Sequence, residues 1–249
     1  MIIIKNSREI ALMRESGEIV AKVLEMIGNY IKEGISTHEI DRLCEDMILS
    51  LGATPSFKNY NGFKGSVCTS LNDVVVHGIP SKTEILKSGD IISVDVGAYK
   101  NGFHGDAART FSVGDVSSKA KELIKITEES FFEGIKYAKE GYRLGDISNA
   151  IQRFVEDRGY SIVRDFTGHG IGESLHEDPA IPNYGAKGSG VLLKRGMTLA
   201  IEPMVTSGDF KVMVLPDNWT TKTRDGSLSS HYENTILITE NEAEILTLI

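Results

Sequence analysis

The sequence has little cysteine, no long apolar run and no excess of basic residues. Its two cysteines, Cys44 and Cys68, lie outside any CxxC pair, so they build no disulfide framework and indicate a reducing compartment. No apolar run approaches the roughly 20 residues of a membrane helix, and the first ten residues lack a signal-peptide core. The net charge of −8 is opposite in sign to that of a nonspecific nucleic-acid or anionic-membrane binder. We therefore expect a cytoplasmic protein with no direct nucleic-acid specificity and no membrane partner.

The composition and the hydrophobic pattern predict one α+β domain over residues 1–249. With 41% hydrophobic and 25% charged residues, the chain is neither disordered nor collagen-like nor a coiled coil, and no Pro/Gly-rich linker divides it. Two batches of helices and strands make an internal duplication conceivable, although no residue-level repeat proves it. Helical periodicity, with a capping box at Ser36 and Glu39, predicts helices over 7–32, 36–51, 117–140 and 146–157. The predicted strands are 68–69, 73–76, 91–96, 103–111, 197–206 and 231–239.

Two aspartates fall within one predicted hairpin. Asp95 lies inside an apolar strand, where an isolated charge is costly, and Asp106 follows on the return strand. A two-residue turn at Lys100-Asn101 or at Asn101-Gly102 puts both carboxylates on one face, whereas a three-residue turn puts them on opposite faces. On one face they repel unless a cation lies between them. The alternative is a hydrogen-bonded aspartate at a strand end beside a solvated one.

One histidine and two glutamates extend this set. His169 has glycine on both sides, which lets the backbone bend and leaves little bulk for the imidazole to pack against. Glu202 ends one apolar strand and Glu233 opens another, although a glutamate at a strand start is often simply exposed. Four carboxylates balance the charge of two divalent cations, and the imidazole adds a neutral ligand. No thiolate belongs to the set, which argues against a structural zinc site.

These residues lie in segments that resemble a known family. The segments are Asn72–Pro80 (NDVVVHGIP), GHGIG around His169, Ile201-Glu202-Pro203 and Tyr232-Glu233-Asn234. With Asp95 and Asp106, they resemble the bacterial type 1 methionine aminopeptidases of the M24 metallopeptidases, over nearly the whole chain. The resemblance implies the pita-bread fold, in which two helix pairs back a curved antiparallel sheet with pseudo-two-fold symmetry. It implies removal of the N-terminal methionine, before a small second residue, by a hydroxide that two metal ions activate.

The same resemblance assigns roles to individual residues. It implies a dinuclear centre of Co, Mn, Fe or Zn held by Asp95, Asp106, His169, Glu202 and Glu233, with Asp106 and Glu233 bridging. Glu202 is the implied proton shuttle, His176 contacts the scissile carbonyl, and His77 contacts the peptide near its second residue. The implied wall of the methionine pocket is Tyr60, Phe63, Cys68 and Trp219, and Phe57 and Leu175 stand where relatives often differ. The implied substrates are peptides and nascent chains, with ribosome association and a monomeric state expected.

Two other functions remain open at this point. The first is an Xaa-Pro peptidase of the same fold, although such enzymes usually carry an extra N-terminal domain. The second is a binding module of this fold that has lost catalysis. Such modules lose metal ligands, whereas every ligand position here keeps Asp, His or Glu.

Overall fold

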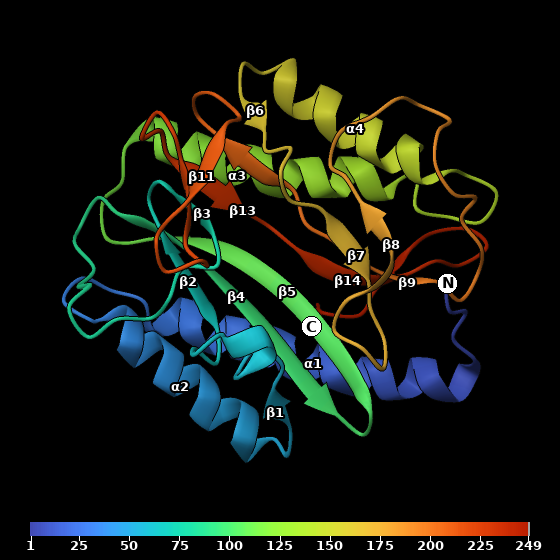
Figure 1. Cartoon of the computed structure of the whole chain (residues 1–249), viewed down its shortest axis with the longest axis horizontal. Helices are drawn as coiled ribbons and strands as arrows, with labels where there is room; N and C mark the ends of the chain where they lie inside the picture. Colours follow the sequence, from blue (N-terminus) through green and yellow to red (C-terminus); the bar gives the residue numbers. More distant parts are fainter. Residues whose placement is uncertain (249) are drawn as a thin grey trace.

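Four long helices flank the strands in two pairs (Figure 1). The computed structural model describes residues 1–248. Helices α1 (Ser7–Tyr30) and α2 (Thr37–Ser50) pack on strands of the first half of the chain. Helices α3 (Ser118–Ile135) and α4 (Leu144–Glu156) pack on strands of the second half. The strands lie between the two pairs, which confirms the expected α+β fold.

Capping residues mark the observed starts of α1 and α2, whereas apolar periodicity did not predict where α3 ends. Asn6 and Glu9 form a capping box at the start of α1, and Ser36 caps α2 by accepting from the Glu39 amide. The prediction of a helix to residue 140 is wrong, because α3 ends at Ile135. The amide of Glu140 instead donates to the carbonyl oxygen of Thr239, more than 90 residues away in the chain. That contact lies beyond the reach of local periodicity.

Antiparallel strands form four hydrogen-bonded groups. The first contains β1 (Thr54–Pro55), β2 (Cys68–Leu71), β4 (Ile91–Lys100) and β5 (Phe103–Ser112). The second contains β6 (Ser161–Ile162), β10 (Met204–Thr206) and β13 (Ser229–His231). The third contains β3 (Val74–Val76), β11 (Val212–Val214) and β12 (Thr221–Thr223). The fourth contains β7 (Gly168–Gly170), β8 (Glu177–Ile181), β9 (Thr198–Ile201), β14 (Asn234–Leu237) and β15 (Glu244–Ile245).

Two predicted strands are each divided in the structure. The range 197–206 becomes β9 and β10, separated by Glu202-Pro203, and 231–239 becomes β13 and β14, separated by Tyr232-Glu233. Proline has no amide to donate, so Pro203 interrupts the first ladder. Both breaks contain a predicted metal ligand, so each glutamate lies where its strand changes partners.

Two hydrophobic cores hold the helix pairs against the strands. One fills the space between α1, α2 and the β4–β5 hairpin and contains the fully buried Cys44, which packs there as a small apolar side chain. The other lies between α3, α4 and the strands of the second half. The single 3-10 turn in the described residues, η1 (Tyr60–Gly62), lies outside both cores. Within residues 1–248, no helix combines the length and the apolar character needed to cross a membrane.

Candidate metal centre

The β4–β5 hairpin places both aspartates on one face. Its turn is Asn101-Gly102, one of the two predicted positions, and both turn residues have positive φ (52° and 92°), as a tight two-residue hairpin requires. Asp95 pairs with Ala108, and Asp106 pairs with Gly97, two positions along the ladder. Because successive side chains alternate between faces, the carboxylates are diagonal neighbours on the same side.

The glycines around His169 allow two strands to approach its backbone closely. A Cβ on Gly168 would lie 2.3 Å from the carbonyl oxygen of Ala200, and one on Gly170 would lie 2.1 Å from that of Asp178. The Nδ1 atom of His169 is 2.8 Å from the Gly170 carbonyl oxygen, which can only accept, so Nδ1 carries the ring proton. The lone pair of Nε2 therefore faces the acidic side chains.

Backbone contacts hold the two glutamates in their strand breaks. The amide of Glu233 donates to the carbonyl oxygen of Ala108 (3.0 Å), next to the aspartate hairpin. The half-buried Arg109 side chain donates from its guanidinium to the carbonyl oxygen of Glu233 (2.5 Å). On the other side, the Asn183 amide donates to the carbonyl oxygen of Glu202 (2.9 Å). Both carboxylates are thus fixed by their backbones rather than by pairing with cationic side chains.

The side chains meet in a buried cluster without hydrogen bonds between the imidazole and the acids. His169 Nε2 is 3.7 Å from Glu202 Oε1 and 3.9 Å from Asp106 Oδ2, distances too long for a hydrogen bond. One carboxylate oxygen on each of Asp95, Asp106 and Glu233 is buried with no partner. Buried polar atoms without partners are costly, so this donor set fits divalent cations that would bind between the side chains.

Burial and mutual repulsion perturb the ionisation of these groups. Burial raises the pKa of Asp95 to about 7. Burial together with neighbouring carboxylates raises the pKa of Asp106, Glu202 and Glu233 well above the ordinary value of an acid. Burial also lowers the pKa of His169 to about 3, so its imidazole is neutral. Cations at the centre would oppose every upward shift of the acids.

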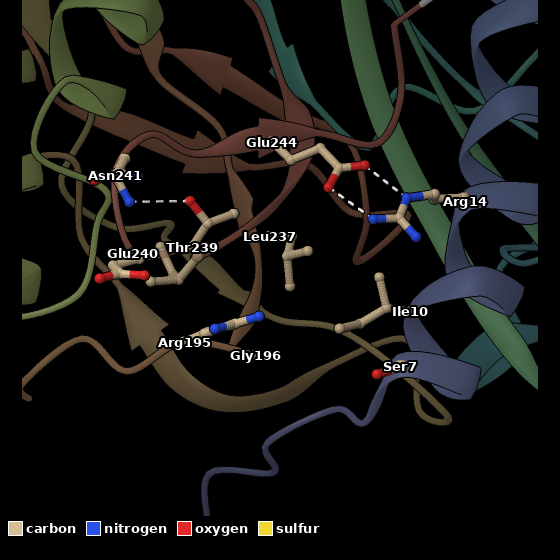
Figure 2. Close-up of a pocket in the computed structure, with 11 residues that line it drawn as sticks. Ser7, Ile10, Arg14, Arg195, Gly196, Leu237, Thr239, Glu240, Asn241 and Glu244 are labelled. Atoms are coloured by element: carbon tan, nitrogen blue, oxygen red, sulfur yellow. Dashed lines mark hydrogen bonds and ion pairs between the residues drawn. The ribbon is translucent and has the colours of Figure 1, made fainter.

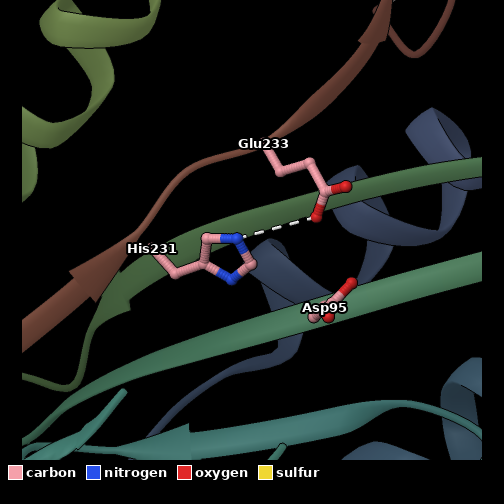
Figure 3. A group of neighbouring side chains, drawn as sticks. All are labelled: Asp95, His231 and Glu233. Carbon is pink, nitrogen blue, oxygen red and sulfur yellow. Dashed lines mark ion pairs between the residues drawn. The ribbon is translucent and has the colours of Figure 1, made fainter. Parts of the chain in front are cut away.

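The sequence reasoning missed His231, which also lies in this cluster. Two groups of donor atoms have all members within 4.8 Å of one another: Asp106, His169 and Glu233, and Asp95, His231 and Glu233. Figure 3 shows the second group, with the imidazole of His231 directed at the Glu233 carboxylate above Asp95. The two-residue spacing of His231 and Glu233 was the available signal, because alternate residues of an extended segment share a face.

A cavity of about 240 Å³ joins the cluster to an apolar wall. The Phe63 and Trp219 rings meet edge to face, with centroids 5.1 Å apart, and Cys68 is buried beside them. All the residues predicted for the metal centre, the catalytic groups and the pocket line this cavity: Asp95, Asp106, His169, Glu202, Glu233, His77, His176, Tyr60, Phe63, Cys68 and Trp219. Phe57, Asn61 and Leu175 line it as well.

Two further histidines flank the cluster at this wall. The Tyr60 hydroxyl is 2.6 Å from Nδ1 of His176, whose ring centroid is 4.3 Å from that of His169. His77 has a left-handed backbone (φ 59°) and packs edge-on against Trp219. Burial lowers the pKa of both His77, to about 4, and His176, so both rings are neutral near pH 7.

A second cavity, of about 370 Å³, lies between the start of α1 and the C-terminal strands. Its strongest charged contact is a two-fold hydrogen bond from the Arg14 guanidinium to the Glu244 carboxylate (2.6 and 2.8 Å), shown in Figure 2. Both side chains are partly exposed. The cavity is larger, but neither of the two groups of possible metal ligands found in residues 1–248 lies in it.

Comparison with known proteins gives matches along the whole chain. The model of metallopeptidase family M24 matches residues 11–240. A methionine aminopeptidase of Clostridium acetobutylicum is 55% identical over 248 residues, covering 100% of this chain and 99% of that one. The crystal structure of a methionine aminopeptidase from Thermotoga maritima superposes with a TM-score of 0.98 at 49% identity, covering all of both chains. A prolidase from Pyrococcus furiosus shares the fold at a TM-score of 0.80 and 27% identity, with 99% of this chain and 66% of that one covered.

Proposed function

This chain belongs to metallopeptidase family M24, and we infer from that premise that it is a methionine aminopeptidase. It removes the N-terminal methionine from peptides and nascent proteins and prefers a small second residue. One observation carries the inference: acidic and imidazole donors, three of them with a buried carboxylate oxygen that lacks a partner, line a cavity that aromatic and aliphatic side chains also line.

We propose that Asp95, Asp106, His169, Glu202 and Glu233 would hold two divalent cations. The two donor groups share Glu233, so its carboxylate faces both parts of the cluster. Cations bound here supply Lewis-acid chemistry, lowering the pKa of water and polarising a carbonyl. An oxygen-rich set with one imidazole accepts Co, Mn, Fe or Zn, and we propose these as its metals.

The remaining chemistry belongs to side chains around the scissile bond. The Glu202 carboxylate accepts a proton from the attacking water and passes it to the leaving amine. His176 donates from Nε2 to the carbonyl oxygen, because the Tyr60 hydroxyl at Nδ1 can supply its own proton to that atom. His77, which packs against Trp219 in the wall of the cavity, contacts the peptide near its second residue. These roles are proposals that rest on proximity in the cavity and on the family.

The apolar end of the cavity is proposed to bind the methionine side chain. Tyr60, Phe63, Cys68 and Trp219 offer aromatic rings and a sulfur, which make favourable contacts with a thioether. Phe57 and Leu175 narrow the same space, so we expect them to influence which side chains and inhibitors fit.

We further propose that the whole chain forms one catalytic domain that acts as a cytoplasmic monomer. Donors from both halves build one cavity, which supports a single domain. The free, buried Cys44 and Cys68 suit a reducing compartment. Nascent chains as substrates favour action at the ribosome, and the acidic net charge gives no reason to expect binding to nucleic acid.

A peptide assay tests the proposed function against its alternatives. Purified protein with Co²⁺ or Mn²⁺ is offered Met-Ala-Ser and Ala-Pro-Ala. We expect methionine release from the first peptide only, and loss of that release with a chelator or in Asp95→Ala. Cleavage of Ala-Pro-Ala would indicate an Xaa-Pro peptidase, and cleavage of neither peptide would indicate a binding module. Release that survives complete metal stripping would overturn the mechanism.

A further inference from the structure

His231 is a buried imidazole whose Nε2 atom has no hydrogen-bond partner. The residue is 2% exposed, and Nε2 is one of the few buried side-chain polar atoms without a partner among residues 1–248. Its nearest acidic atoms are Glu233 Oε2 at 3.6 Å and Glu202 Oε2 at 3.8 Å. Both distances exceed the range of a hydrogen bond, so the ring faces the acids across a gap.

The same relation holds for the expected imidazole ligand. His169 Nε2 lies 3.7 Å from Glu202 Oε1 and 3.9 Å from Asp106 Oδ2. The carboxylate of Glu202 therefore lies between two histidines, with one oxygen toward each. The distances that identify His169 as a possible metal ligand therefore identify His231 as one too, on the other side of the Glu202 carboxylate.

The gaps are of the size expected between ligands of one cation. Donors bound to one ion at about 2.1 Å are about 3.0–3.5 Å apart in octahedral or tetrahedral arrangements. Separations of 3.6–3.9 Å are slightly wider, so small movements would bring each set around an ion. A direct hydrogen bond, by contrast, would need the ring and the carboxylate to be about 2.8 Å apart.

We propose that His231 is a sixth protein ligand of the metal centre and supplies a nitrogen donor on the Asp95 side. This inference rests on the proposed function, because it assumes that the centre holds two divalent cations. Without His231, that side has only carboxylates, whereas Asp95, His231 and Glu233 together form a mixed donor set (Figure 3). Imidazole favours Fe, Co and Zn over the harder Mn, so His231 shifts the preference of the centre toward the borderline metals.

Proton NMR of the protein loaded with two equivalents of Co²⁺ counts the bound imidazoles. Each histidine bound through Nε2 gives one hyperfine-shifted, solvent-exchangeable ring N–H signal. We expect two such signals in the wild type, from His169 and His231. A single signal in the fully loaded wild type overturns the proposal, and this result does not depend on the folding of any variant.

Three variants assign the signals. His231→Gln and His169→Gln are each expected to lose one signal, and the control His38→Gln, on α2 away from the cavity, keeps both. Retention of both signals in folded, fully loaded His231→Gln overturns the proposal. Calorimetric titration gives a second readout: the loss of affinity in His231→Gln is expected to be about tenfold greater for Co²⁺ than for Mn²⁺. Equal losses would indicate that His231 only supports other ligands.

The methionine-release assay on the same Co²⁺-loaded wild type distinguishes failure of the His231 proposal from failure of the proposed function. Methionine release together with a single imidazole signal would contradict only the proposal that His231 is a ligand. Absence of release, whatever the signal count, removes the proposed function.

Discussion

Two cavities of the molecule, the one at Arg14 and Glu244 and the one at the candidate metal centre, differ in how their charged groups are satisfied. At the larger one, Arg14 and Glu244 satisfy each other through two hydrogen bonds, and their side chains are 49% and 39% exposed. At the smaller one, acids are buried with oxygen atoms that no protein group satisfies. The contrast shows that buried carboxylate oxygens without hydrogen-bond partners, rather than the volume of the cavity, distinguish the candidate metal centre.

The difference has an energetic reason. An exposed ion pair keeps water as an alternative partner, so forming or losing it changes little. A buried carboxylate has no such alternative and destabilises the fold until a cation binds. The acids of the smaller cavity therefore lower the stability of the metal-free protein, and the same acids enable it to bind cations.

The largest expected effect comes from neutralising a carboxylate in the smaller cavity. Asp95→Asn keeps the size of the side chain but removes a charge and a ligand oxygen. We expect kcat/KM for Met-Ala-Ser to fall on the order of 10³-fold, or about 4 kcal/mol of transition-state stabilisation. Steady-state kinetics with metal analysis checks this. If Asp95→Asn kept its full metal content and its activity, the smaller cavity would no longer be distinguished from the larger one as the site of the reaction.

The pH dependence of stability should differ between the metal-free wild type and Asp95→Asn. Burial raises the pKa of Asp95 from 3.8 to about 7, so the folded state holds a proton that the unfolded state releases. Below about pH 4, Asp95 is protonated in both the folded and the unfolded state and does not change the free energy of unfolding. As pH rises from there toward 7, the free energy of unfolding falls by up to about 4 kcal/mol. The amide side chain of the variant cannot ionise, so the variant loses the Asp95 share of this decline, while Asp106, Glu202 and Glu233 keep theirs. Urea unfolding with a chelator measures both curves, and parallel curves would contradict the prediction.

A smaller effect is expected at the apolar end of the same cavity. Trp219→Ala removes a ring that packs against Phe63, and with it contact area for the methionine side chain. We expect a loss of about 10–100-fold in kcat/KM for methionyl peptides, typical of a hydrophobic pocket contact. Metal content should remain unchanged, since Trp219 holds no cation. A variant that loses metal instead would show that the two ends of the cavity are not separable.

The smallest effect is expected at the larger cavity. Arg14→Ala breaks the paired charges and should lower the free energy of unfolding by about 1 kcal/mol or less. Methionine release should be unaffected. Chemical denaturation and the peptide assay measure the two outcomes, and a large kinetic defect would connect this cavity to the reaction.

Local patterns in the sequence predicted the aspartate hairpin and the helix starts. The alternation around Asp95, the turn-forming Asn101-Gly102 and the cap at Ser36 are short-range features. The end of α3 at Ile135 was not predictable from local periodicity, because the following chain bonds to Thr239.

The convergence of the site needed more than spacing. The roles given to His77, His176 and the pocket residues came from family resemblance, since nothing near them in sequence sets them apart. The two-residue spacing of His231 and Glu233 was visible but carried no weight alone. Only the fold brings that imidazole to the acids of a distant hairpin.

The Asn101-Gly102 turn has a consequence for how related chains can diverge. It lies at the far tip of the hairpin, where positive φ at both residues and a hydrogen bond from Asn101 Nδ2 to the exposed Glu15 carboxylate (2.8 Å) restrict its identity. Yet one inserted residue there would slide one strand past the other and carry Asp106 to the opposite surface. Substitutions in this turn that keep positive φ are thus tolerated, whereas a change in its length is not. We therefore expect insertions and deletions to be rarer in this turn than in other surface loops.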